Sequence, residues 1–92
     1  MFIVVAYDIP DDKKRNKIAK ILEGFGIRVQ YSVFECNISY KQFLILKDKI
    51  QRIINPSEDR VYFYSLCPRC RRRIIKLGQT GTYDIDSEVI II

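Results

Sequence analysis

Histidine is absent from this 92-residue sequence. Its absence removes the commonest general base, the usual zinc ligand and every serine–histidine or cysteine–histidine nucleophile pair. Any catalysis must therefore come from carboxylates, hydroxyls, thiols or a bound metal. The sequence also lacks an apolar run long enough to span a bilayer, and it lacks a signal peptide with a basic start and a cleavage site. We therefore expect a cytoplasmic protein with no membrane partner.

Cysteine is scarce and odd in number, with only Cys36, Cys67 and Cys70. Without a secretory context, this argues against a disulfide framework. Cys67 and Cys70 form one C-x-x-C motif, which is half of a zinc site whose fourth ligand would have to come from an acid or a second chain. A redox C-x-x-C normally opens a helix after a strand, whereas we expect this one to precede a basic strand. Buried or loop thiols are the default interpretation, with zinc binding and redox catalysis as alternatives.

Charge is unevenly distributed along the chain. Residues 1–78 hold all 16 lysines and arginines but only 8 acids, a net charge of +8, whereas residues 79–92 carry three acids and no base, a net charge of −3. A basic body favours polyanionic partners, chiefly nucleic acid, although many soluble domains are mildly basic. The length allows one hydrophobic core, and the composition is that of a globular protein.

Apolar periodicity predicts alternating strands and helices. The run from Phe2 to Tyr7 indicates a central strand covered on both faces. Pro10 ends it, and Asp11 or Asp12 offers the N-cap of a helix with an apolar face. In "IRVQYSVFECNI" the alternation changes phase near Val33–Phe34, which predicts two short strands or one sharply bent strand.

A capping box of Ser39 and Gln42 predicts a second helix, roughly residues 40–54. Three further strands are expected in "RVYFYSLC", "RRIIKLG" and "EVIII". The order predicts an α+β, ferredoxin-like βαββαβ sandwich over residues 1–78, with both helices on one face. Residues 79–92 would be a connector and an extra strand, which pairs with its own sheet or with a partner subunit because an unpaired edge promotes aggregation.

Asp8 is the most informative single residue, because it places a carboxylate at the end of a central strand. It could be a turn residue that accepts hydrogen bonds from the amides of residues 10–12. Alternatively, it could bind Mg²⁺, which tolerates few protein ligands because it dehydrates reluctantly. One carboxylate alone gives a metal few protein ligands, and a twofold axis that brought two copies of Asp8 together would give a better site. Without histidine, phosphodiester cleavage would need metal-bound water.

Two basic clusters could bind phosphate groups. The first lies within about two helical turns of Asp8 and the second follows the C-x-x-C motif; together they comprise Lys13, Lys14, Arg15, Lys17, Arg69, Arg71, Arg72 and Arg73. The first cluster could instead be an ordinary solvated helix face. In the second, Arg71 and Arg73 would share one face of a strand. At the phase break, Ser32 or Glu35 could support the Asp8 site, and Phe34 could contact a base or a partner or simply belong to the core.

These residues resemble the CRISPR-associated family-two proteins, the small subunits of the spacer-acquisition machinery. The specific part is the strand end Tyr7-Asp8-Ile9 together with Ser32-Val33-Phe34-Glu35, and the likeness covers essentially the whole chain. It implies a ferredoxin-like homodimer whose C-terminal strand packs onto the partner's sheet. It also implies either a magnesium-dependent endonuclease of single-stranded RNA or double-stranded DNA, or a non-catalytic bridge between integrase dimers.

By the same resemblance, Asp8 is the catalytic metal ligand, and Mg²⁺ is shared between two chains. Tyr7, Arg15 and Phe34 fall next to the site. Lys17 occupies a position where the family often has arginine, which keeps the charge but loses the bidentate fork. A third interpretation, a small-molecule-sensing regulatory domain, fits the topology but does not explain the basic body.

Overall fold

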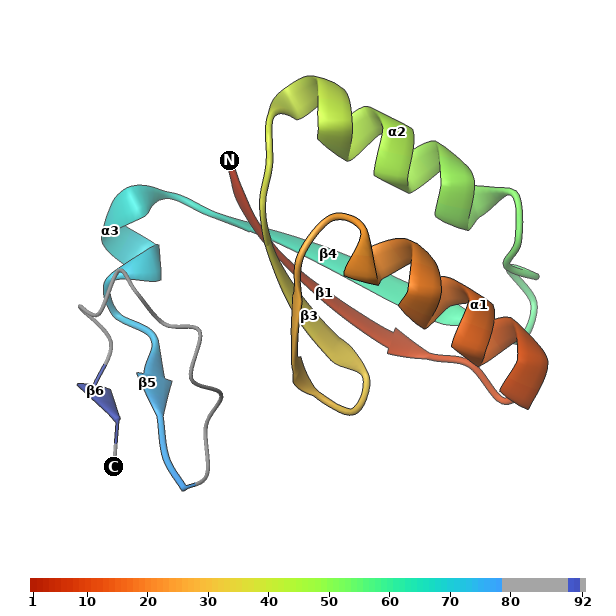
Figure 1. Cartoon of the computed structure of the whole chain (residues 1–92), viewed down its shortest axis with the longest axis horizontal. Helices are drawn as coiled ribbons and strands as arrows, with labels where there is room; N and C mark the ends of the chain where they lie inside the picture. Colours follow the sequence, from red (N-terminus) through yellow and green to blue (C-terminus); the bar gives the residue numbers. More distant parts are fainter. Residues whose placement is uncertain (79–89, 92) are drawn as a thin grey trace.

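The computed structural model describes residues 1–78 and 90–91. Its main sheet has four antiparallel strands in the order β2-β3-β1-β4, formed by Ile27–Gln30, Val33–Asn37, Phe2–Asp8 and Arg60–Leu66. Helices α1 (Asp12–Glu23) and α2 (Tyr40–Gln51) join the strands (Figure 1). The predicted α+β, ferredoxin-like βαββαβ core is therefore confirmed. No helix in the described ranges is long and apolar enough to cross a membrane.

Alternation along the strands separates the two faces of the sheet. Ile3, Val5 and Tyr7 of β1 point into the core, where they meet buried residues of β3, α1 and α2. The buried residues contributed by those three elements are Phe34, Cys36, Ile18, Ala19, Leu22, Leu46 and Ile50. The opposite face, which we call the open face, carries the other residues of each strand. Helix capping agrees with the sequence, because Asp11 caps α1 and Ser39 and Gln42 form the capping box of α2.

The predicted break in the long β-rich segment is confirmed, two residues before the expected phase change. Strands β2 and β3 are separated by Tyr31 and Ser32, and their register shifts between Arg28 and Gln30. The shift is the extra residue expected of a bulge and lies in β2, whereas Phe34 of β3 lies opposite Val5 and is buried in the core.

The C-terminal part departs from the prediction. Within "RRIIKLG" only Ile75–Lys76 form a strand, β5, and a short helix α3 (Pro68–Arg71), which was not predicted, precedes this stretch. Strand β5 pairs in parallel with β6 (Ile90–Ile91) of the same chain. Cys67 and Pro68 begin a helix because Cys67 caps it and proline suits its first position. The expectation that the C-x-x-C motif precedes a strand directly was therefore wrong. The other residues of the predicted C-terminal unit lie outside the described ranges, and its packing on a partner stays a prediction.

Replacing Gly26 by alanine is expected to destabilise the fold by about 1–3 kcal/mol, the range typical of overpacking. A Cβ atom at Gly26 would overlap the backbone oxygen of Glu35 and lie 2.5 Å from Sγ of Cys36. Urea unfolding measures the effect. Gly24→Ala is the control, because a Cβ there would be 3.3 Å from its nearest neighbour, the Ile21 oxygen. Equal stability of the two variants would contradict the close packing at Gly26.

Candidate metal and nucleic-acid site

Asp8 ends β1 on the open face, where its carboxylate is exposed. Its neighbour across the sheet is Arg60 of β4. In the described part of the chain, no hydrogen bond or ion pair occupies the Asp8 side chain. The amide of Lys14 donates instead to Asp11, at 2.8 Å. The interpretation of Asp8 as a turn carboxylate is therefore wrong, and its oxygens are open to a ligand.

Arg15 holds the loop that follows Asp8. Its guanidinium donates to the carbonyl oxygens of Ile9, at 2.9 Å, and Pro10, at 3.4 Å, and it pairs with Asp12. It also lies 5.9 Å from the centre of the Tyr31 ring. These contacts make Arg15 a positioning residue beside the predicted site, with much of its hydrogen-bonding capacity already used.

Tyr7 and Phe34 lie on the core side of the sheet, on and next to the strand that carries Asp8. Their rings stack at 6.3 Å, and the Tyr7 hydroxyl donates to the Tyr31 carbonyl at 3.3 Å. Burial raises the pKa of Tyr7, and the guanidinium groups of Arg28 and Arg15 partly oppose this rise. Phe34 has no exposed surface, so the prediction that it contacts a base or a partner was wrong.

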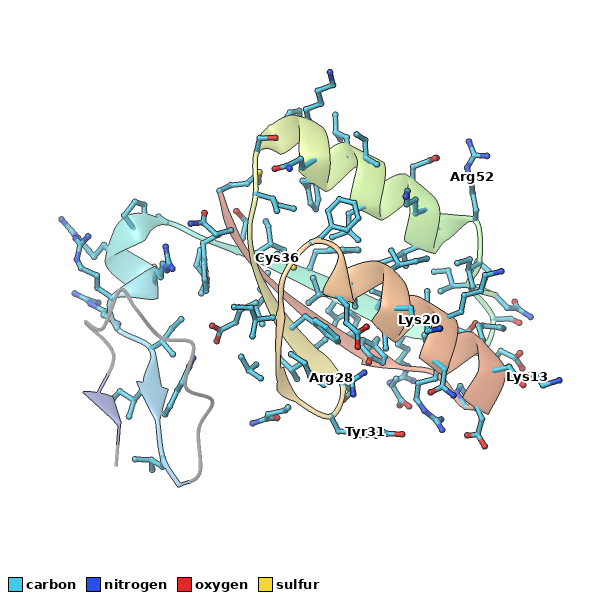
Figure 2. The ribbon with its side chains drawn as sticks, viewed as in Figure 1. Lys13, Lys20, Arg28, Tyr31, Cys36 and Arg52 are labelled. Atoms are coloured by element: carbon cyan, nitrogen blue, oxygen red, sulfur yellow. The ribbon has the colours of Figure 1, made fainter. Side chains whose placement is uncertain are left out.

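Lys14 differs from its neighbours in the first basic cluster. Its amine lies 2.8 Å from the buried carboxylate of Asp59, which also accepts from the amide of Asn55 at 2.7 Å. The ion pair raises the pKa of Lys14. Lys14 therefore joins α1 to the segment before β4, and Asp59 competes for its amine with the phosphate contact predicted for it. Lys13 and Lys17 are exposed, and Lys13 points away from the ribbon at the start of α1 (Figure 2).

Acid should weaken the fold through Asp59. The Asn55 amide and the Lys14 amine lower the pKa of Asp59. Stability from this group is therefore present above the unfolded carboxyl pKa of about 3.9 and is lost as the pH falls through the lower folded value. We expect the stability difference between wild type and Asp59→Asn to shrink steadily below about pH 4, as measured by urea unfolding. A difference that stayed constant to the most acid pH would contradict this linkage.

The second basic cluster lies on α3 and the turn after it, which corrects the prediction that Arg71 and Arg73 share a strand face. Arg69 and Arg71 belong to α3, and Arg72 and Arg73 to the turn after it. The Arg71 guanidinium lies 4.2 Å from the centre of the Phe2 ring. Because Phe2 and Asp8 are at opposite ends of β1, the cluster lies about 20 Å from Asp8 within one chain. Figure 1 shows α3 and the start of α1 at opposite ends of the sheet.

Two contacts had not been anticipated. Arg28 lies 5.2 Å from the centre of the Phe34 ring, next to Tyr7, and it is near the β2–β3 turn in Figure 2. The apolar alternation of this segment does not predict the contact, although Arg28 is a cation within it. Glu35 pairs with Lys76 at 3.2 Å, and both side chains are largely buried. Since Glu35 lies opposite Val4, it is four residues along β1 from Asp8 and does not support that site.

Known proteins resemble the chain in both sequence and fold. The family model described as "CRISPR associated protein Cas2" matches residues 1–74. A CRISPR-associated endoribonuclease Cas2 of Chloroflexus aurantiacus is 41% identical over 93 residues, which cover both chains completely. The crystal structure of Streptococcus pyogenes Cas2 superposes with a TM-score of 0.76 at 34% identity, over 85% of this chain and all of the other. A chain of a partial Cas6-RT-Cas1–Cas2 complex gives a TM-score of 0.56 at 29% identity, over 75% and 91% of the two chains.

Proposed function

This chain belongs to the CRISPR-associated Cas2 family, and from that premise we propose that it is a nucleic-acid-binding protein of CRISPR adaptation with magnesium-dependent endonuclease activity. Asp8 is its metal ligand, contributed by each of two chains. The observation that carries the proposal is the exposed Asp8 carboxylate, which forms no hydrogen bond or ion pair with the described residues and lies on the open face of the sheet. The names of relatives as endoribonucleases support RNA as one substrate.

The residues present suit Mg²⁺ only as a site between two chains. Among the described residues, no three histidine, cysteine or acidic side chains are grouped to hold a metal. Magnesium, however, binds through one or two carboxylates, with waters and substrate phosphates completing its shell. Two copies of Asp8 meet that requirement. Bound there, Mg²⁺ would neutralise phosphate charge and lower the pKa of a water molecule.

The open face supplies a surface for the second copy. Tyr62 and Tyr64 of β4 are 53% and 50% exposed there, with their rings 6.1 Å apart, and Ile27 of β2 is 45% exposed. By strand alternation, Asp8 shares this face. Apolar surface of this kind is better buried than hydrated, so packing two open faces together favours a homodimer with Asp8 near the interface.

The basic residues near Asp8 and those of the second cluster would then have separate roles. Arg15 keeps the Ile9–Pro10 loop in place, which fixes the chain directly after Asp8. Lys13 and Lys17 are exposed cations that can contact phosphate. The arginines of the second cluster are about 20 Å away, roughly the span of six base pairs, and so suit an extended nucleic acid.

Cleavage by the purified wild-type protein tests the proposal. We expect cleavage of single-stranded RNA or duplex DNA that requires added Mg²⁺, stops with excess chelator, and follows the fraction of dimer as protein concentration changes. Sedimentation velocity measures that fraction. Cleavage that continued at the same rate in chelator, or that did not depend on dimer formation, would overturn the shared metal site.

A second candidate is a duplex-binding scaffold that joins integrase subunits without cutting. The resemblance to a chain in a Cas1–Cas2 complex favours it. The wide separation of the two basic clusters also favours it, because the cluster about 20 Å from Asp8 can bind phosphate groups but cannot take part in chemistry at Asp8. Spacer acquisition that survived an inactive Asp8 variant would establish this role on its own, whereas loss of acquisition with intact duplex binding would reject it.

A further inference from the structure

The C-x-x-C motif takes no part in the proposed function, yet its geometry is specific. Cys67 directly follows β4 and caps α3, in which Cys70 completes the first turn. Both thiols are exposed, whereas Cys36 is buried. The backbone N–H of Cys70 donates to Sγ of Cys67 at 3.4 Å. The sulfur of Cys67 therefore lies next to the backbone of Cys70, the residue that carries the second thiol.

We propose that Cys67 and Cys70 form a thiol–disulfide exchange site for anionic low-molecular-weight disulfides, with Cys67 as the attacking thiol and Cys70 as the resolving thiol. The site does not depend on nuclease activity or on Asp8. The sequence had argued against a redox pair because a strand was expected after the motif. The strand-to-helix junction found here removes that objection.

The roles of the two thiols follow from their contacts. Hydrogen bonds from the amide and the thiol of Cys70 lower the pKa of Cys67. The same thiol contact raises the pKa of Cys70. Near neutral pH, Cys67 is therefore the thiol with the larger thiolate fraction, and the thiolate is the form that attacks a disulfide.

The exchange balances in two steps. The Cys67 thiolate attacks one sulfur of a disulfide R–S–S–R, forming a Cys67–S–R bond and releasing one thiolate. The Cys70 thiolate then attacks Sγ of Cys67, forming the Cys67–Cys70 disulfide and releasing the second thiolate. The two protons from the cysteines end on the released thiols, so two cysteines are oxidised while the external disulfide is reduced.

Charge around the motif selects anionic disulfides. The sequence from Arg60 to Gly78 contains no acidic residue, and Arg69 in α3 and Arg73 in the turn after it are exposed. Cations near a reacting sulfur attract an anionic partner and raise its encounter rate, most strongly at low ionic strength. Oxidised glutathione carries net negative charge and is the natural probe of this class.

Reaction of the reduced full-length protein with oxidised glutathione tests the proposal. We expect wild type to form a Cys67–Cys70 disulfide, located by peptide mass mapping, without accumulating a mixed disulfide. Cys70→Ser should accumulate glutathione on Cys67, and Cys67→Ser should react on the order of tenfold more slowly at Cys70. Cys36→Ser should behave as wild type.

Substrate charge gives an independent readout. Changing Arg69 and Arg73 to glutamine should slow the reaction with oxidised glutathione but not with neutral hydroxyethyl disulfide. Equal rates for the Cys67→Ser and Cys70→Ser variants would overturn the assigned roles. A mixed disulfide that persisted on wild type would overturn the resolving step. Protection of both thiols by one equivalent of Zn²⁺ alone would show a metal site instead.

Discussion

Asparagine in place of Asp8 is expected to lower magnesium-dependent cleavage about 100-fold or more, because the metal contributes several kcal/mol of transition-state stabilisation and each 1.36 kcal/mol is tenfold in rate. Asparagine has the same shape but lacks the charge that holds a divalent cation. Since Asp8 is exposed and its side chain forms no hydrogen bond or ion pair with the described residues, the substitution should change folding stability by no more than about 0.5 kcal/mol. Initial cleavage rates at saturating substrate, alongside urea unfolding, measure both effects.

The matched control is Asp48→Asn, which removes another exposed carboxylate, one paired with Arg52 at 2.9 Å on α2. It should leave cleavage unchanged, so a general loss of negative charge cannot explain the Asp8 result. Binding of duplex DNA should survive in both variants, because the basic clusters are intact. Cleavage by Asp8→Asn at the wild-type rate would reject Asp8 as a metal ligand and leave the scaffold role as the better explanation.

The fold was largely predictable because its signals are local. A capping box, a helical apolar face and the phase change near Val33–Phe34 each depend on residues close in sequence, and each has its counterpart in the structure, the last as the break at Tyr31–Ser32. The prediction for the C-terminal part was wrong because the local signals there conflict. The apolar and basic run after Cys70 has strand propensity, but Cys67 and Pro68 start a helix there, and their capping geometry outweighs that propensity.

The site was predictable only in part, because long-range contacts decide which charges are already paired. Nothing local separates Lys14 from Lys13, yet Lys14 pairs with Asp59, 45 residues away. Glu35 is likewise neutralised by Lys76 from β5. In contrast, the open carboxylate of Asp8 could be anticipated, since its place at a strand end follows from the apolar run before it.

Alanine in place of Phe34 is expected to cost about 3–5 kcal/mol of unfolding free energy, the range for removing a fully buried phenylalanine. Phe34 stacks on Tyr7 and pairs across the sheet with Val5, so truncation leaves a cavity beneath the strand that carries Asp8. Urea unfolding at fixed protein concentration measures the loss, with Phe34→Leu as a milder control because it refills most of the volume. Because the side chain is wholly buried, any fall in cleavage should match the fall in folded protein. Full stability with lost cleavage would instead place Phe34 on the substrate-binding surface.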